Sequence, residues 1–313
     1  MFKWLNRALW TFAAIGLIGW VYQTIALSRD EGRYHAPGKL IDIGGGRRLH
    51  LECRGAGSPT VILASGLGSP EILWHNVMKG VEPTTRVCAD DRAGYGYSDA
   101  RLEPLMTNRI VDDLEKLLVV AGEKGPYLMV GHSLGGFAIR VFASRHRSDV
   151  TGLVFVDSSH PEQIARMTQP GFLKKAGTEA VVAALPLFSR LGVVRGVADW
   201  VGAPGELKFL VTQPKFARTL VGEWNALAES GAQTAAASPS FGDLPILVLT
   251  RGTAGGDPKD YEIWRDQLQP ELARLSTMGT RIIVEGSSHM IPTERPQAVI
   301  DAIRQLLEQK PQR

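Results

Sequence analysis

From residue 40 onwards, hydrophobic positions form short runs that alternate with segments of helical spacing. The short runs are typical of strands and cover residues 40–43, 47–53, 60–64, 86–89, 126–130, 152–156, 245–250 and 281–285. Apolar residues three and four positions apart predict helices at 108–121, at 137–145 and after Pro296. This alternation predicts an α/β fold with a mostly parallel sheet that is covered on both faces. The first two runs flank three glycines and predict an antiparallel hairpin.

The strand pattern stops between residues 158 and 243. Segments 174–184 and 204–228 have helical character there, and prolines interrupt the region at Pro170, Pro186, Pro204 and Pro214. Because strands resume immediately afterwards, we interpret 158–243 as a helical cap inserted into one core. That core comprises residues 39–157 and 244–310. A separate helical domain is the alternative.

The N-terminal region has a different pattern, because residues 9–27 carry no charge. As a helix this stretch would be about 28 Å long, close to the roughly 30 Å hydrocarbon core of a bilayer. Aromatic residues lie toward its ends, as interfacial aromatics do. We predict an uncleaved membrane anchor at 9–27 between a short basic tail, 1–8, and a polar linker, 28–38. A cleaved signal peptide and a buried soluble helix are the alternatives.

Positive charges flank this stretch on both sides, so the positive-inside rule is nearly balanced. A short N-terminal tail stays most simply in the cytoplasm. This topology predicts a single-pass membrane protein whose folded body lies on the non-cytoplasmic side.

Composition excludes several other classes of function. The chain has 313 residues, and its 35 basic and 32 acidic side chains give a formal net charge of +3. Basic residues form no stripe interleaved with aromatics, so no nucleic-acid partner is predicted. Cysteines and histidines show no zinc-like spacing, and no glycine run is typical of a phosphate-binding loop. We therefore expect neither a metal nor an organic cofactor.

One motif, Gly131-His132-Ser133-Leu134-Gly135, lies between an apolar run and a helical segment. A strand, a sharp turn and a helix in this order form a nucleophile elbow, which exposes the serine hydroxyl at a helix N-terminus. These residues resemble the α/β-hydrolase family, and the resemblance extends over about residues 40–310. It implies that Ser133 is a nucleophile, with a small molecule carrying an acyl group as the substrate.

The same resemblance implies a histidine base and an acid that orients it. His289 follows the last predicted strand, where the family keeps its base, whereas His132 is expected to point away and pack. The family usually takes its acid from the loop after 245–250, which offers Asp257. Pancreatic-type lipases are similar in taking it one strand earlier, which offers Asp157. We prefer Asp157, because it directly follows a strand and Asp257 lies in a glycine-rich loop.

The resemblance also implies backbone donors for an oxyanion. Leu134 N–H follows the nucleophile, and Leu67 N–H lies in the Ser65-Gly66-Leu67-Gly68 loop, where many members have His-Gly-x-x-Gly. Gly66 is therefore a candidate substrate-binding residue. His160 either lines the pocket or caps the first cap helix. Arg92 is expected to hold its own loop through a salt bridge.

Two cysteines are present, Cys53 and Cys88. They fall on the second and fourth predicted strands, which are neighbours in the family's sheet order. A disulfide between them is expected if the body lies outside the cytoplasm, and two buried free thiols are the equal alternative.

Together these features predict a membrane-anchored serine hydrolase that cleaves a carboxylic ester through an acyl-enzyme. The alternatives are other proteins of the same fold: a proline-type aminopeptidase, a lactonase, an acyltransferase, a cofactor-free haloperoxidase or a non-catalytic binding protein. Dehalogenases and epoxide hydrolases of this fold carry Asp at the elbow, so Ser133 argues against both. The cap has apolar residues that either line an acyl pocket or pack within the cap: Leu185, Leu187, Phe188, Leu191, Phe209, Leu210 and Trp224.

Overall fold

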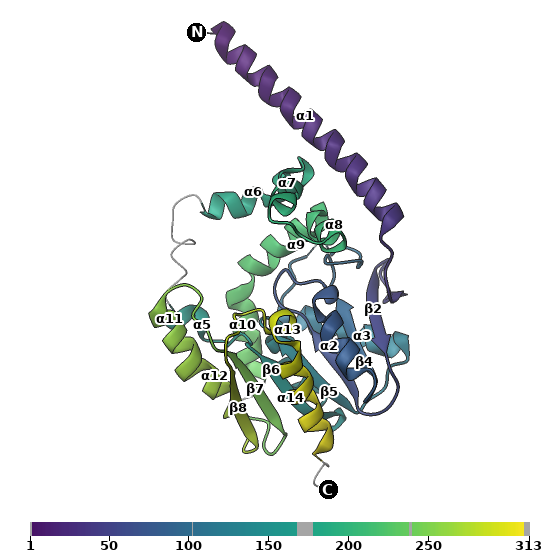
Figure 1. Ribbon diagram of the computed structural model, residues 1–313, viewed down its shortest axis with the longest axis vertical. Helices are drawn as coiled ribbons and strands as arrows, with labels where there is room; N and C mark the ends of the chain where they lie inside the picture. Colours follow the sequence, from purple (N-terminus) through teal and green to yellow (C-terminus); the bar gives the residue numbers. More distant parts are fainter. Residues whose placement is uncertain (1, 102, 168–177, 238–239, 310–313) are drawn as a thin grey trace.

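The computed structural model describes residues 2–101, 103–167, 178–237 and 240–309. Three positions named from the sequence lie outside these ranges: Pro170, the start of the helix predicted at 174–184, and residue 310 at the end of the predicted core. Figure 1 shows a compact body from which one long helix, α1, projects at the N-terminus.

The body is built on a sheet of eight strands in the order β1-β2-β4-β3-β5-β6-β7-β8. The strands are β1 (Lys39–Asp42), β2 (Arg48–Arg54), β3 (Thr60–Ala64), β4 (Val87–Asp91), β5 (Tyr127–His132), β6 (Val150–Val156), β7 (Ile246–Arg251) and β8 (Gly279–Val284). Strand β2 pairs antiparallel with both β1 and β4, and the remaining pairs are parallel. The predicted α/β fold, including the antiparallel hairpin at its start, is confirmed.

Helices and helical turns fill the connections. The described helices are α1 (Phe2–Arg33), α2 (His75–Val81), α3 (Thr107–Ala121), α4 (Gly135–Arg145), α5 (Gln163–Arg166), α6 (Thr178–Arg190), α7 (Val193–Trp200), α8 (Gly205–Thr212), α9 (Pro214–Asn225), α10 (Leu227–Ala237), α11 (Pro258–Ile263), α12 (Gln269–Ala273), α13 (Ile291–Glu294) and α14 (Pro296–Glu308). Short turns of other helical types are η1 (Glu71–Trp74), η2 (Arg147–Asp149) and η3 (Trp264–Leu268).

Alternation along the central strands divides the core into two layers. In β3, Val61 and Leu63 contact one cluster of buried side chains, and Ile62 contacts the other. Helices α2 and α14 cover the first face, whereas α3 and α4 cover the second. In Figure 1, α14 crosses in front of the sheet. Two buried faces explain why the central strands have near-continuous hydrophobic runs.

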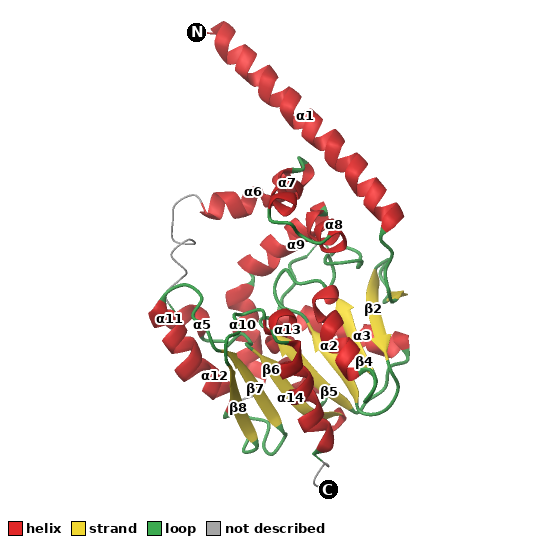
Figure 2. Ribbon diagram, in the orientation of Figure 1, coloured by secondary structure: helices red, strands yellow, loops and turns green. Residues whose placement is uncertain are grey.

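Helices α5 to α10 are inserted between β6 and β7, where the sequence predicts a helical cap. Figure 2 shows α6 to α9 at one end of the sheet. Pro186 was expected to interrupt a helix, but α6 continues through it to Arg190.

The N-terminal helix is longer than the predicted anchor, because it continues from Phe2 to Arg33. The linker predicted at 28–38 is therefore wrong over its first six residues. The reason is tertiary: Asp30 forms an ion pair with buried Arg195 of the cap, Nη1 to Oδ2 2.7 Å, and this holds the last turns of α1 in place. Residues 9–33 of α1 are apolar enough to span a membrane, and little of this stretch is buried.

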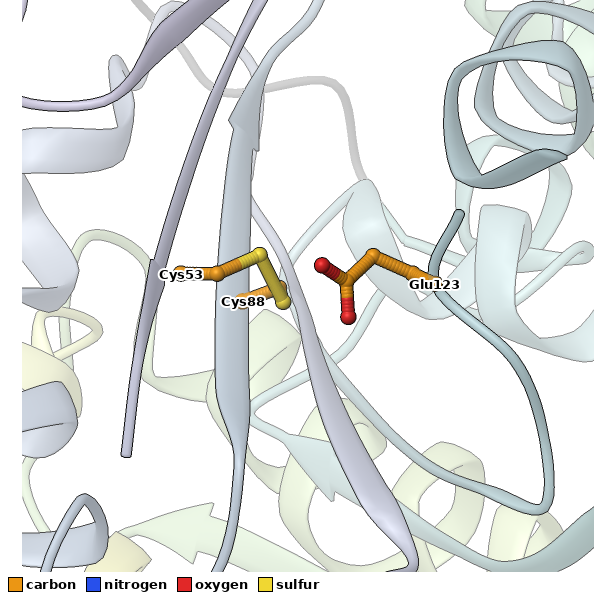
Figure 3. Close-up of side chains that lie close together, drawn as sticks. All are labelled: Cys53, Cys88 and Glu123. Carbon is orange, nitrogen blue, oxygen red and sulfur yellow. A yellow bond between two sulfur atoms is a disulfide. The ribbon is translucent and has the colours of Figure 1, made fainter. Parts of the chain in front are cut away.

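The two cysteines face each other across the antiparallel β2–β4 pair and form a disulfide (Figure 3). Glu123 lies beside them and forms an ion pair with Arg86, Nη2 to Oε1 2.5 Å. Neither sulfur is free to act as a nucleophile or metal ligand.

Candidate active site

Ser133 stands at the turn between β5 and α4 with a φ of 51°, a left-handed conformation that is strained for a serine. Its flanking glycines allow this turn. A Cβ on Gly131 would lie 2.6 Å from the carbonyl oxygen of Gly135, and one on Gly135 would collide with the backbone of Ala64. The local geometry therefore matches a nucleophile elbow.

His289 follows β8 and reaches Asp157 at the end of β6. Its Nδ1 lies 2.6 Å from Asp157 Oδ2. Ser133 and His289 both line one cavity. Three residues that are far apart in sequence are thus gathered at the carboxyl ends of β5, β6 and β8, which lie in the same half of the sheet.

The Asp157 carboxylate is fully buried and has four donors. Oδ1 accepts hydrogen bonds from Trp264 Nε1 at 2.8 Å and from the backbone N–H of Arg251 at 3.1 Å, while Oδ2 contacts His289 and Arg251 Nη1. Burial on its own raises the pKa of Asp157, but the bond to His289 and the charges of His289 and Arg251 outweigh it and lower the pKa below its usual value. The carboxylate is therefore ionised at neutral pH.

The alternative acid, Asp257, lies elsewhere. Its exposed side chain accepts a hydrogen bond from Lys259 N–H at 2.9 Å and caps the N-terminus of α11. The structure thus brings Asp157, rather than Asp257, to His289.

His132 packs, as expected, because its ring is buried edge-on against Trp74. It was also expected to point away from the site, but it lies beside His289 instead. Its buried ring lies 4.7 Å from the ring of His289, and its Nε2 is 2.9 Å from the His289 carbonyl oxygen. Burial, reinforced by the charge of His289, lowers the pKa of His132 to about 3. A neutral His132 with its proton on Nε2 can donate to this carbonyl and so position the loop that carries His289.

The loop after β3 runs directly against the elbow. A Cβ on Gly66 would lie 2.9 Å from Ser133 Cβ, so only glycine allows this approach. The next residue, Leu67, and the residue after the nucleophile, Leu134, have backbone N–H groups without an acceptor among the described residues. Two unused donors beside a serine can stabilise an oxyanion.

Arg92 holds this loop and connects it to the cap. Its guanidinium donates to the carbonyl oxygens of Ser65 and Gly66 at 2.6 and 2.9 Å. It also forms a buried ion pair with Glu223 of α9, Nε to Oε1 3.1 Å. The expected salt bridge exists, but it crosses to the cap rather than staying within the loop of Arg92.

The cavity has a volume of about 460 Å³ and a mainly apolar wall on the cap side. Its lining comprises Ser133, Ser159, Gln163, Ile164, Met167, Trp224, Asn225, Leu227, Ala228, Arg251, Trp264 and His289. Of the apolar cap residues considered from the sequence, Trp224 is the one in this lining. Phe209 and Leu210 are buried, with the Phe209 ring against Tyr34 and Tyr97, and Leu187 is exposed.

His160 is absent from the lining that the described residues provide. Its Nδ1 accepts a hydrogen bond from the N–H of Glu162 at 3.2 Å, just before α5, and its Nε2 lies 3.4 Å from Glu271. Burial lowers the pKa of His160 to about 4. Of the two roles considered for His160, the structure favours that of a residue near the start of a cap helix.

Sequence reasoning missed two contacts of the acid. Trp264 and Arg251 both donate to Asp157 and both line the cavity. Arg251 ends β7, so a position at the carboxyl edge of the sheet was a usable signal. Trp264 belongs to the irregular turn η3, and nothing in its sequence neighbourhood distinguished it.

Three clusters of described side chains have a composition that could hold a metal ion, and in one of them, with Glu123, the two cysteines are bonded to each other. The other two are His50, Glu71 and Asp91, and His160, Glu162 and Glu271. Neither includes a residue that lines the cavity. In the first of these two, the Asp91 carboxylate already accepts hydrogen bonds from His50 and from two backbone N–H groups. These contacts account for its oxygens without an ion.

A model of the alpha/beta hydrolase family matches residues 61–302. With this fold and this match over most of its length, the chain belongs to the alpha/beta hydrolase family. The family assignment made from the elbow motif is confirmed.

Curated relatives are similar over different lengths. An uncharacterized protein of Schizosaccharomyces pombe is 27% identical over 301 residues, which cover 83% of this chain and 53% of the relative. A probable transporter of Hormonema carpetanum is 39% identical over 140 residues, 42% of this chain and 20% of that protein. An uncharacterized vacuolar membrane protein of Saccharomyces cerevisiae is 32% identical over 104 residues, 31% of this chain and 16% of that protein. The chain therefore spans about half the length of the first relative and less of the other two.

Solved structures share the fold. Cfl2 from Burkholderia cenocepacia superposes with a TM-score of 0.68 at 24% identity and covers 85% of this chain and 94% of its own. A putative lipase from Acinetobacter baumannii has a TM-score of 0.65 at 22% identity, with coverages of 91% and 95%. The Cif epoxide hydrolase from Acinetobacter nosocomialis has a TM-score of 0.71 at 18% identity, with coverages of 92% and 96%.

Proposed function

We propose that this protein is a membrane-anchored serine hydrolase that cleaves a carboxylic ester of a small molecule. One observation carries the proposal: His289 lies 2.6 Å from a buried aspartate and shares a cavity with a serine held in an elbow. A base with an orienting acid, next to a serine, is the arrangement that activates a hydroxyl for acyl transfer.

In the proposed reaction, the Nδ1–H of His289 is donated to Asp157, which leaves Nε2 free to take the proton of Ser133. The serine oxygen attacks the ester carbonyl, and the N–H groups of Leu67 and Leu134 bind the oxygen that becomes negative. His289 then returns its proton to the leaving alcohol. Water repeats the sequence on the acyl-enzyme and releases the acid, and no cofactor takes part.

The serine at the elbow and the apolar lining of the cavity favour ester hydrolysis over the other reactions of this fold. Epoxide hydrolases share the architecture, but the family resemblance gives them an aspartate where this chain has Ser133. A cavity of about 460 Å³ is within the range of small-molecule sites, and Trp224, Leu227 and Met167 provide an apolar surface for an acyl chain. The structural likeness to a putative lipase is consistent with this choice.

Covalent labelling tests the proposal. A fluorophosphonate probe should modify the full-length protein in detergent and fail to modify Ser133→Ala. An ester panel of increasing acyl length, with lactones alongside, then defines the substrate. If the folded wild-type chain is not labelled, the serine is not activated, and a non-catalytic binding role replaces the hydrolase.

We also propose that α1 anchors the protein with its body on the non-cytoplasmic side. The long apolar stretch supports an anchor, and the Cys53–Cys88 disulfide supports an oxidising compartment. The full chain should stay in the membrane pellet under alkaline carbonate. Protease added outside sealed, right-side-out vesicles should digest the body, and a protected body would overturn the orientation.

A further inference from the structure

We propose that helix α7 of the cap forms a second membrane-contacting surface, which lies in the same leaflet as the outer end of α1. This surface, called here the cap face, consists of Val193, Val197, Trp200 and Val201, with Leu187 of the preceding helix α6. The inference rests on the proposed anchor. It does not depend on the proposed hydrolysis.

Helix α7 exposes an apolar face, while Arg195 and Ala198 are its buried positions and Asp199, paired with Lys208, is its exposed charge. Its apolar positions follow helical spacing and face outward, and Trp200 is 86% exposed. Arg195, in contrast, is buried on the opposite side. Amphipathic helices that bind a bilayer expose an apolar face to the lipid in this way.

Contacts between the cap and α1 show where along the length of α1 the cap face lies. The Leu191–Gly192 turn joins α6 and α7 and lies directly against α1: a Cβ on Gly192 would be 3.2 Å from the Tyr22 ring, and one on Gly19 would collide with the Leu191 carbonyl. Gly19 is eight positions before Leu27, or about 12 Å along a helix. The turn therefore lies well inside the apolar stretch, and lipid that surrounds α1 at this level also reaches the cap.

A buried polar cluster also indicates that the cap lies beside the apolar stretch of α1. Gln23 belongs to the apolar stretch, yet its side chain is buried against the cap. It accepts a hydrogen bond from Arg195 Nε at 2.9 Å and donates to the Thr212 carbonyl at 2.9 Å. Arg195 also pairs with Asp30. Polar groups at membrane depth must be paired within the protein, and here the cap supplies the partners.

We therefore infer that lipid covers the cap face, because the cap face adjoins the surface of α1, which is itself exposed and apolar. Figure 1 shows α6 and α7 beside α1, at the end of the body from which α1 projects. A second copy of the chain is the competing occupant.

Depth-dependent fluorescence tests this proposal in the full-length chain. Val197→Cys places one free thiol on the cap face for an NBD probe, since Cys53 and Cys88 are bonded to each other. Val120→Cys is the matched control: Val197 and Val120 are 54% and 56% exposed, but Val120 lies in the last turn of α3, whose chain leads into the start of β5. Val120 therefore lies near the amino ends of the parallel strands, whereas the cap lies at their carboxyl ends. Both proteins are reconstituted into phosphatidylcholine vesicles with and without doxyl-labelled phosphatidylcholine.

We expect blue-shifted emission and loss of most of the fluorescence with doxyl lipid for Val197→Cys, and neither change for Val120→Cys. Trp200→Cys, labelled in the same way, should behave like Val197→Cys. Equal solvent exposure and equal quenching at positions 197 and 120 would overturn the proposal. Blue-shifted emission that doxyl lipid does not quench would also overturn it, because the cap face would then be covered by protein. None of these readouts requires turnover, so failure of the hydrolase proposal is recognised separately.

Discussion

Arg92 and Glu223 form a buried ion pair across 131 positions of sequence, with Arg92 Nε 3.1 Å from Glu223 Oε1. Tyr95 donates to the same carboxylate at 2.6 Å. Because Arg92 also donates to the carbonyls of Ser65 and Gly66, one guanidinium joins the loop beside the serine to cap helix α9. The position of the proposed oxyanion donors is thereby coupled to docking of the cap.

We expect Glu223→Leu to destabilise the protein by about 3–5 kcal/mol, because it leaves a buried guanidinium without its counter-charge. The double variant Arg92→Met/Glu223→Leu should lose less than the sum of the two single losses. Urea unfolding measures all three, and additive losses would contradict the coupling. As a control, Asp243→Asn breaks the exposed pair with Arg147 and should cost at most about 1 kcal/mol.

Asp157→Asn should lower kcat by about 10⁴-fold, since an amide cannot hold His289 in the required tautomer or stabilise its charged form. Asp257→Asn is the matched control, because asparagine caps helices as well as aspartate does. Steady-state kinetics on a soluble ester compares the two variants. A large loss in Asp257→Asn with little loss in Asp157→Asn would refute the proposed acid.

His132→Phe should lower kcat by up to about 100-fold with little change in KM, because the loop that carries His289 loses a hydrogen-bond donor while an aromatic ring remains at this position. The pKa of His132 is about 3, so the imidazole is already neutral when the enzyme works. The apparent pKa values of the pH–rate profile should therefore not move, and a displaced acid limb would argue against a positioning role. His160→Phe, at a buried histidine that does not line the cavity, should retain kcat.

Glu71 predicts a specific dependence of stability on pH. Burial, with the charges of Asp91 and Glu52, raises the pKa of Glu71 from 4.5 to about 9. Between these values the folded chain keeps a proton that the unfolded chain releases, so this group destabilises the fold progressively as the pH rises. Glu71→Gln removes that penalty and should raise the melting temperature at pH 8 by about 2–4 °C or more, with the difference shrinking toward pH 4.5.

Thermal melts across this pH range check the effect. Glu285→Gln, at an exposed carboxylate, controls for the change of net charge. A constant difference between Glu71→Gln and the wild type at all pH values would show that Glu71 contributes through packing rather than through its proton.

Local patterns in the sequence were sufficient to predict the strands and the elbow, and the family resemblance pointed to His289 after the last strand. Hydrophobic periodicity depends on which faces of a helix or strand are buried. The glycines beside Ser133 indicate a sharp turn, which is formed by residues adjacent in the sequence. Hydrophobic patterns placed Cys53 and Cys88 on the second and fourth strands, and the family's sheet order implied that these strands are neighbours. Whether the two cysteines are opposite one another depends on strand register, which the β2–β4 pairing decides.

Tertiary structure decided how the site is completed. Asp157 and Asp257 both follow strands in the sequence, but only the path of the loop after β8 brings His289 to Asp157 and leaves Asp257 to cap a helix. His132 lies under His289, and Trp264 donates to Asp157, through contacts between segments more than a hundred residues apart. Such contacts depend on how separate elements pack together, and a pattern within one element carries no information about the distance to another.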